Sequence, residues 1–240
     1  MSSFPHTLKS YDRELTELHS LVSQMAGYAQ AQLEGAVTAL VHRHLDGARA
    51  IALSDNKLDD LERRVERLVV EVIARRSPVA DDLRDIIAAL KISSALERIG
   101  DYAKNIAKRT AVLTRNHPVP VAATLPQIAA EAGRMINDAI DAYVNGEAEQ
   151  AIEVWERDER VDNLYNGLFR ELLTYMMENP KLITPCTHLL FCAKNIERVG
   201  DQATNIAELV YFAITGETMK SMRPKCDLTA FEMPDLSDDE

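Results

Sequence analysis

Apolar residues recur every three to four positions over long stretches of this chain, which is the spacing of one buried face of an α-helix. No stretch alternates apolar and polar residues in the way that a half-buried strand does. The spacing predicts six long helices, over residues 15–40, 58–72, 92–106, 128–142, 161–172 and 196–210. We therefore expect an all-α protein.

Proline and glycine separate these predicted helices. The stretch 116–120 holds two prolines and cannot continue a helix, so it is expected to link two halves of the chain. Ser77-Pro78 in the first half and Asn179-Pro180 in the second fall between the second and third helix of each half. Three helices joined by short turns favour an antiparallel three-helix bundle in each half.

An internal repeat supports this division. Residues 97–107 read ERIGDYAKNIA and residues 197–207 read ERVGDQATNIA, identical at eight of eleven positions. Charged residues and glycines recur as faithfully as apolar ones, so helix periodicity alone does not explain the match. We interpret the chain as a tandem duplication, with bundles over 1–117 and 118–216 and an acidic tail over 217–240 that we expect to be disordered.

Composition narrows the class of protein. The net charge of −11 disfavours binding to nucleic acid, whose phosphates an acidic surface repels, and suits cations or a basic partner surface. The three cysteines have no C-x-x-C spacing, which is typical of reduced thiols in a cytosol. We see neither a signal peptide nor an apolar run of the ~20 residues that a membrane span needs, so a soluble cytoplasmic protein is expected.

Carboxylates occur in pairs four residues apart, two pairs in each half. A spacing of four places both members of a pair on one face of a helix, and helical-wheel arithmetic places that face outward, opposite the core. Neighbouring helices could bring two such rows together over a groove, where four carboxylates would bind Mg²⁺, Ca²⁺, Mn²⁺ or iron. The candidate metal ligands are Asp55, Asp59, Glu97, Asp101, Asp158, Asp162, Glu197 and Asp201.

Other readings of these acids stay open. They could form a solvated polar face, or be neutralised by the adjacent Arg98 and Arg198. Asn105 and Asn205 continue each row and could add amide oxygens to a metal site or form structural hydrogen bonds.

Two glycines support the interpretation of the acids as metal ligands. Gly100 and Gly200 lie inside the second acidic pair of each half, in mid-helix, where glycine costs about 1 kcal/mol relative to alanine. A glycine retained at such a place predicts a close approach to the backbone. We find no nucleophile with a partnering base and no histidine-containing di-iron motif, so we assign no catalytic residues and expect a protein that is not an enzyme.

With its repeat, six helices and paired acids, the chain resembles the PhoU family over roughly residues 8–216. The resemblance implies two three-helix bundles, each with two E(D)-x-x-x-D motifs at the positions named above. It also implies a cytoplasmic homodimer that represses phosphate uptake and phosphate-starvation signalling. Its expected partners are the ATPase subunit of a phosphate ABC transporter and a sensor histidine kinase, through which alone it meets the membrane.

The resemblance also bears on the cofactor. Some members of the family carry multinuclear iron or other metal clusters on the acidic motifs, so metal ions of unspecified identity are expected here. Two alternatives remain, namely a metal-dependent hydrolase or oxidase on the same carboxylates and a helical scaffold without metal. The tail after Gly216 departs from the family pattern.

Overall fold

The computed structural model describes residues 9–53, 56–120 and 124–219. No residue in these ranges lies in a β-strand, so the predicted all-α class is confirmed. The described helices are α1 (Lys9–Val41), α2 (Leu45–Leu53), α3 (Asn56–Arg76), α4 (Ala80–Leu113), α5 (Leu125–Asn145), α6 (Ala148–Glu156), α7 (Asp158–Glu178), the 3₁₀ helix η2 (Pro180–Leu182) and α8 (Ile183–Thr215).

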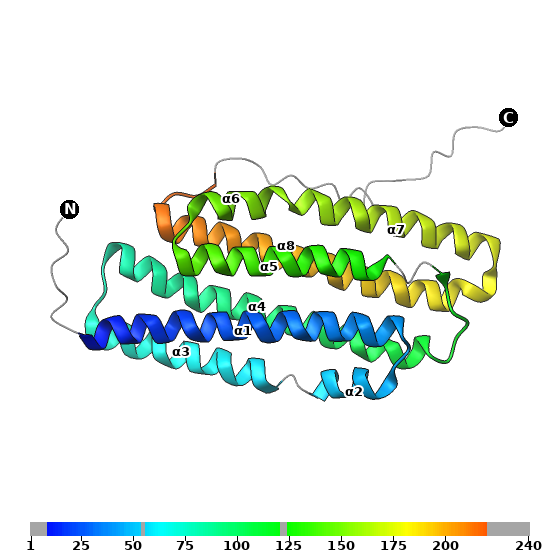
Figure 1. Cartoon of the computed structure of the whole chain (residues 1–240), viewed down its shortest axis with the longest axis horizontal. Coiled ribbons are helices and arrows are strands. Elements are labelled where there is room, and N and C mark those ends of the chain that lie inside the picture. Colours follow the sequence, from blue (N-terminus) through cyan, green and yellow to red (C-terminus); the bar gives the residue numbers. More distant parts are fainter. Residues whose placement is uncertain (1–8, 54–55, 121–123, 220–240) are drawn as a thin grey trace.

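The helices form two three-helix bundles that lie against each other (Figure 1). In the first half α1 and α4 pack together, with α2 and α3 end to end as the third member. In the second half α5 and α8 pack together, with α6 and α7 as the third member. The halves meet where α4 contacts α8 and α1 contacts α5. The tandem arrangement that the repeat predicted is confirmed.

The short helices α2 and α6 are the main departure from the prediction. The sequence pattern left these segments unassigned, because two turns of helix carry too few apolar positions to show a period. In α2 only Ala48 is fully buried. In α6 the buried Trp155 fills the core, and its indole Nε1 donates a hydrogen bond to Oε1 of Glu208 on α8 (3.0 Å).

Glycine and proline act at the helix ends as the sequence indicates. Gly146 follows α5 with a φ of 70° and Gly216 follows α8 with a φ of 74°, in the left-handed region that glycine enters without strain. Pro126 lies in the first turn of α5, where the missing N–H is no loss. The segment between Leu113 and Leu125 therefore separates the two halves.

Arg43 joins the end of α1 to the end of α4. Its Nη2 donates hydrogen bonds to the carbonyl oxygens of Leu113 (2.6 Å), Thr114 (2.8 Å) and Asn116 (2.5 Å). The last carbonyls of a helix have no partner within the helix, so a guanidinium there replaces the missing donors. This one side chain fixes the direction in which the chain leaves the first bundle.

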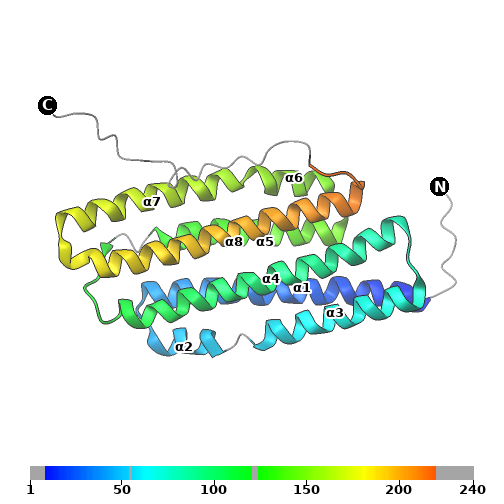
Figure 2. The ribbon, with the colours of Figure 1, turned by 180° about the vertical axis from the view of Figure 1, so that it is seen from behind.

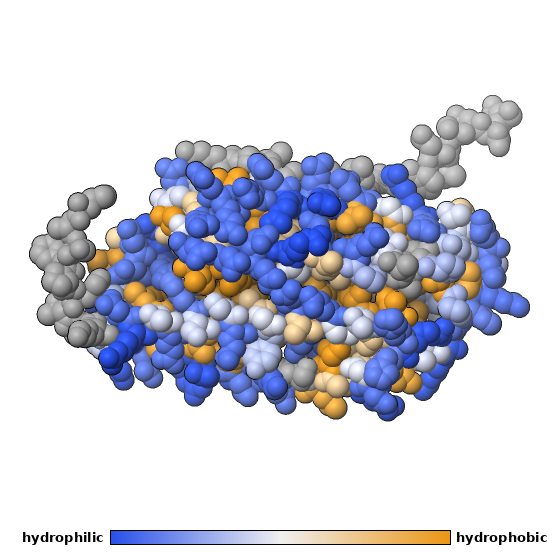
Figure 3. Space-filling view, in the orientation of Figure 1, coloured by the Kyte–Doolittle hydropathy of each residue, from blue (hydrophilic) through white to orange (hydrophobic). Residues whose placement is uncertain are grey.

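The face formed by α1 and α5 is largely hydrophilic, with hydrophobic surface in scattered patches (Figure 3). None of the described helices is both long and apolar enough to cross a membrane. The predicted acidic tail lies outside the described residues from position 220 onward, as do Asp55 and Cys226.

Candidate metal centre

The acidic motifs of each half meet where two helices cross at a glycine. A Cβ atom on Gly100 of α4 would lie 2.5 Å from Cδ1 of Leu58 on α3. A Cβ atom on Gly200 of α8 would lie 3.2 Å from Cγ1 of Val161 on α7. Leu58 and Val161 sit inside the first acidic pair of their halves, and the glycines sit inside the second. The close approach that the glycines predicted is therefore helix packing, which brings the two motifs together.

In the second half the first acidic pair is buried, which corrects the prediction of an outward face. Asp158 is 2% exposed and Asp162 is 4% exposed. Both lie in the first turns of α7, which packs against α8, and Oδ1 of Asp158 accepts a hydrogen bond from the hydroxyl of Thr204 (3.1 Å). Wheel arithmetic on a single helix missed this contact because it does not include the side chains that the neighbouring helix presents.

Glu197 of α8 is also buried, against the prediction, at 5% exposed. Its Oε1 accepts a hydrogen bond from Nζ of Lys194 (3.0 Å), and Nζ of Lys194 lies 5.1 Å from the ring centroid of Tyr165. Burial raises the pKa of Glu197 to about 7, and the nearby carboxylates of Asp201 and Asp162 add to the rise. Three carboxylates thus share one electrostatic environment, in which a positive charge is favoured.

In the first half the equivalent acids are more exposed. The side chain of Asp59 is 38% exposed and lies 3.9 Å from Nη2 of Arg63, and the side chain of Asp101 is 51% exposed and lies 3.7 Å from Nζ of Lys104. Glu97 is half-buried. The outward placement is therefore correct for Asp59 and Asp101, which border solvent, whereas Asp55 lies outside the described residues.

Sequence reasoning missed a further acid in the first half. Glu62 of α3 stands where α7 has Tyr165, and burial raises its pKa, with smaller contributions from Glu66 and Asp59. A hydrogen bond to Ser94, which stands where α8 has Lys194, opposes the rise. Aligning the two halves residue by residue reveals both differences: the first half has an extra acid, Glu62, and lacks the base that Lys194 provides in the second.

The predicted auxiliary residues lie apart from these contacts. Arg98 and Arg198 are exposed, and the cations placed beside the acids are Arg63, Lys104 and Lys194 instead. Asn105 is exposed and Asn205 is half-buried. The hydrogen-bonding partner that the sequence did not single out is Thr204.

The carboxylate oxygens are of the type that binds a hard cation, but those in the described part of the chain are not arranged around one point as metal ligands are. Carboxylate oxygens from two helices gather in the second half, and such oxygens are the ligands that Mg²⁺, Ca²⁺ and Mn²⁺ prefer. Within the described residues, however, no three acids, histidines or cysteines are placed to hold a metal ion. A cation would require side chains such as Glu197 to leave their present partners.

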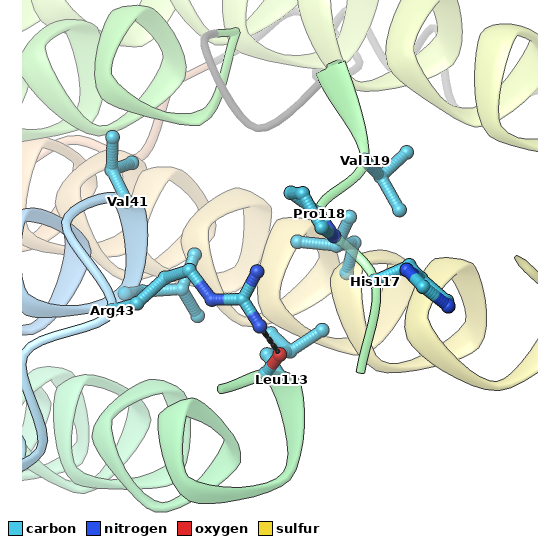
Figure 4. Close-up of a pocket in the computed structure, with 8 residues that line it drawn as sticks. Val41, Arg43, Leu113, His117, Pro118 and Val119 are labelled. Carbon is cyan, nitrogen blue, oxygen red and sulfur yellow. Dashed lines mark hydrogen bonds between the residues drawn. The ribbon is translucent and has the colours of Figure 1, made fainter. Parts of the chain in front are cut away.

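Apart from the acidic motifs, a hollow lies beside Arg43, between the ends of α1 and α4 and the start of α8 (Figure 4). Its volume is about 110 Å³, and no candidate metal ligand lines it. The walls are mostly apolar side chains, and the guanidinium of Arg43 is bonded to backbone carbonyls. The hollow therefore offers little polar chemistry.

The buried thiols offer no nucleophile. Burial raises the pKa of Cys192 to about 12, so this side chain stays a neutral thiol at physiological pH. Burial also raises the pKa of Cys186.

Comparison with known proteins agrees with the duplicated architecture. The model of the PhoU domain matches this chain twice, over residues 22–110 and 125–210. The chain belongs to the PhoU family. Each match spans one of the two bundles, from the α1 or α5 helix to the α4 or α8 helix.

Relatives cover nearly the whole chain. A phosphate-specific transport system accessory protein PhoU homolog of Caulobacter vibrioides is 47% identical, with 93% of this chain and 97% of the relative covered. The homolog of Zymomonas mobilis is also 47% identical, with 96% and 98% covered. The crystal structure of PhoU from Pseudomonas aeruginosa superposes with a TM-score of 0.82 at 34% identity, and covers 87% of this chain and 100% of that one.

Proposed function

We propose that this protein is an accessory protein of a phosphate-specific transport system, which represses phosphate uptake and starvation genes when phosphate is plentiful. The observation that carries the proposal is 47% identity, over 93% of this chain, to a relative with that accessory role in its name. In this proposal the protein is an adaptor between the ATPase subunit of a phosphate ABC transporter and a sensor histidine kinase.

Such an adaptor acts by binding and not by catalysis. The relatives are named accessory proteins, and the described acids of the motifs are paired with lysine, arginine and threonine. A regulator of this kind must bind differently to two states of its partners. We propose a cytoplasmic homodimer that reaches the membrane through its partners alone.

Deletion of the gene tests the regulatory role. Without the protein, starvation genes should stay on in medium with ample phosphate, as a starvation-promoter reporter would measure. Normal repression in the deletion strain would overturn the assignment. A deletion strain complemented with Asp101→Asn/Asp201→Asn should show partial derepression if the acidic motifs regulate, whereas an Asp46→Asn strain serves as a control because Asp46 is exposed on α2.

We also propose that the acidic motifs bind divalent or iron ions, in mononuclear or multinuclear form. The support is the shared environment of Asp162, Glu197 and Asp201 in the second half, with Asp59, Glu97 and Asp101 at the equivalent places. Protein purified without tag or chelator should contain bound metal by elemental analysis. Asp101→Ala should lower metal affinity in the first bundle and leave the second largely unchanged.

A metal-free scaffold is the second candidate, because Lys194 already donates to Oε1 of Glu197 and Thr204 to Oδ1 of Asp158. Oε2 of Glu197 is buried without a hydrogen-bond partner among the described residues, which favours the metal instead. Under that hypothesis the purified protein holds no metal, and adding Mn²⁺, Fe²⁺, Mg²⁺ or Zn²⁺ leaves its melting temperature unchanged. Turnover of a phosphate ester above background, abolished in Asp201→Asn, would instead favour the hydrolase.

A further inference from the structure

One face of the molecule, along the contact of α4 with α8, carries basic and aromatic side chains in a chain whose net charge is −11. Figure 2 shows the two helices side by side along this face. The guanidinium of Arg109 on α4 lies 4.3 Å from the ring centroid of Phe191 on α8. Nη1 of Arg109 lies 3.2 Å from Nδ1 of His188. These contacts identify the row of residues on α4 that lies next to α8 at the surface, and the corresponding row on α8.

Helical periodicity extends the row on α4. Lys91 and Arg98 lie eighteen and eleven residues before Arg109, which is within about 20° of the same direction on an α-helix. Both are exposed. On α8, Arg198 lies seven residues after the half-exposed Phe191, again within about 20°. We call Lys91, Arg98, Arg109, Phe191 and Arg198 the basic face.

The acids of α4 and α8 lie elsewhere. Glu97 and Asp101 and their equivalents Glu197 and Asp201 lie about 60° or more further around their helices, toward α3 and α7. Asp85 pairs with His19 of α1 (2.9 Å), and Glu208 accepts from Trp155 of α6. None of these six acids therefore lies on the basic face.

The two helices run antiparallel, which puts the arginines of the basic face at one level. Nε of Arg84 donates to the carbonyl oxygen of Ala213 (3.3 Å) at one end, and Arg109 meets His188 at the other. In this register residue 98 lies opposite residue 199, so Arg98 and Arg198 lie at about the same level in the middle of the face. A negatively charged ligand bound at this level would be attracted by both guanidinium groups.

We propose that the basic face binds the acidic segment 227–240 of the same chain. This segment holds six carboxylates and no lysine or arginine, with Leu228, Phe231, Met233 and Leu236 among them. Acidic and apolar side chains together are what a face of arginine, lysine and phenylalanine complements. The proposal is independent of the function proposed above.

The chain can reach the face. The site where Gly216 would carry a Cβ atom lies 3.3 Å from Cζ of Arg84, so the chain leaves α8 at the Arg84 end of α4. Arg98 lies fourteen residues further along α4, which is roughly 21 Å at the rise of an α-helix. The eight steps from the Cα atom of Met219 to that of Asp227 span up to about 27 Å when the chain is extended. A tethered segment also binds at the high effective concentration of a short linker.

A spin label on the full chain tests the proposal. In Cys226→Ser/Ser237→Cys a nitroxide attaches at position 237, because Cys186 and Cys192 are buried. Amide signals around Arg98 and Arg198 should then broaden strongly, whereas those around Arg67 on α3 should not. Absence of broadening on α4 and α8 overturns the proposal. Equally strong broadening in a mixture of labelled, unenriched chains with unlabelled, isotope-enriched chains also overturns it, because the segment would then bind another copy.

Charge variants in the same labelled chain decide whether the basic face is the partner. Arg98→Glu/Arg198→Glu should abolish the broadening, whereas the matched control Lys57→Glu/Arg67→Glu should retain it, since both of its positions are exposed on α3. If the first variant loses helicity, neutralising Asp238, Asp239 and Glu240 should also weaken the broadening without a change in the bundles. Broadening that persists in every variant overturns the assignment.

Discussion

At the scale of single residues, the two glycines at the helix crossings differ in how tightly they are packed. Gly100→Ala would press a methyl group onto Leu58, which is fully buried, whereas the space beside Gly200 is larger. Overpacking costs 1–3 kcal/mol, and alanine regains about 1 kcal/mol in helix propensity. The added methyl group would also lie 3.0 Å from Oε1 of the buried Gln32, so repacking of Leu58 and Gln32 together decides the sign for Gly100.

We expect Gly100→Ala to lower the free energy of unfolding by about 1–2 kcal/mol, and Gly200→Ala to change it by less than about 1 kcal/mol. Urea denaturation measures both. The double variant Leu58→Val/Gly100→Ala should recover part of the loss, because valine makes room for the added methyl group. Equal losses at the two glycines would contradict this account of the packing.

Glu197 should make stability depend on pH. Its pKa of about 7 in the folded protein exceeds the ordinary value of 4.5, so the folded state binds more protons than the unfolded state between these values. Stability must then fall as pH rises from about 4.5 to about 7, by up to roughly 3 kcal/mol. In Glu197→Gln, measured with chelator present, this contribution should vanish, whereas Glu66→Gln on the exposed side of α3 should keep it.

The sequence predicted which acids pair along each helix, because a spacing of four fixes a common face. It did not predict their burial, since this depends on what the neighbouring helix presents. Tyr165 and Lys194 cover Glu197, whereas Glu62 and Ser94 stand at the equivalent places in the first half. Side-chain exchanges between the halves therefore separate a buried site from an exposed one.

At the scale of helices, Arg43 shows how one side chain positions two helix ends. It makes three hydrogen bonds to carbonyls at the end of α4, and its own φ of 56° is unusual for a residue with a side chain. The long helices could be predicted from the spacing of their apolar residues. This junction could not be predicted, because its contacts join residues seventy positions apart.

Arg43→Ala should lower the free energy of unfolding by about 1–3 kcal/mol, since it leaves carbonyl groups without donors. Amide exchange around residues 114–117 should accelerate. Arg49→Ala, whose side chain is 76% exposed, should leave both properties nearly unchanged. A smaller loss in Arg43→Gly than in Arg43→Ala would show that glycine relieves backbone strain at this φ, whereas the loss in Arg43→Ala measures the hydrogen bonds because alanine keeps the strain.

At the scale of the whole molecule, the helices α1, α4, α5 and α8 share contacts across the boundary between the halves. We expect a single calorimetric transition in which the calorimetric and van't Hoff enthalpies agree. Leu96→Ala and its counterpart Ile196→Ala, both at fully buried positions, should each shift this transition downward without splitting it. Two resolved transitions would show that the bundles unfold independently.

The contacts between the halves also indicate how the duplicated chain could have arisen. The most extensive of them join equivalent helices, α1 with α5 and α4 with α8, as an interface does when one surface meets a copy of itself. A gene duplication that fused two subunits of an ancestral dimer would produce this pattern. Once both copies lay on one chain, each was free to change alone. The buried acids of one half and the solvent-bordering acids of the other are the divergence that such a fusion permits.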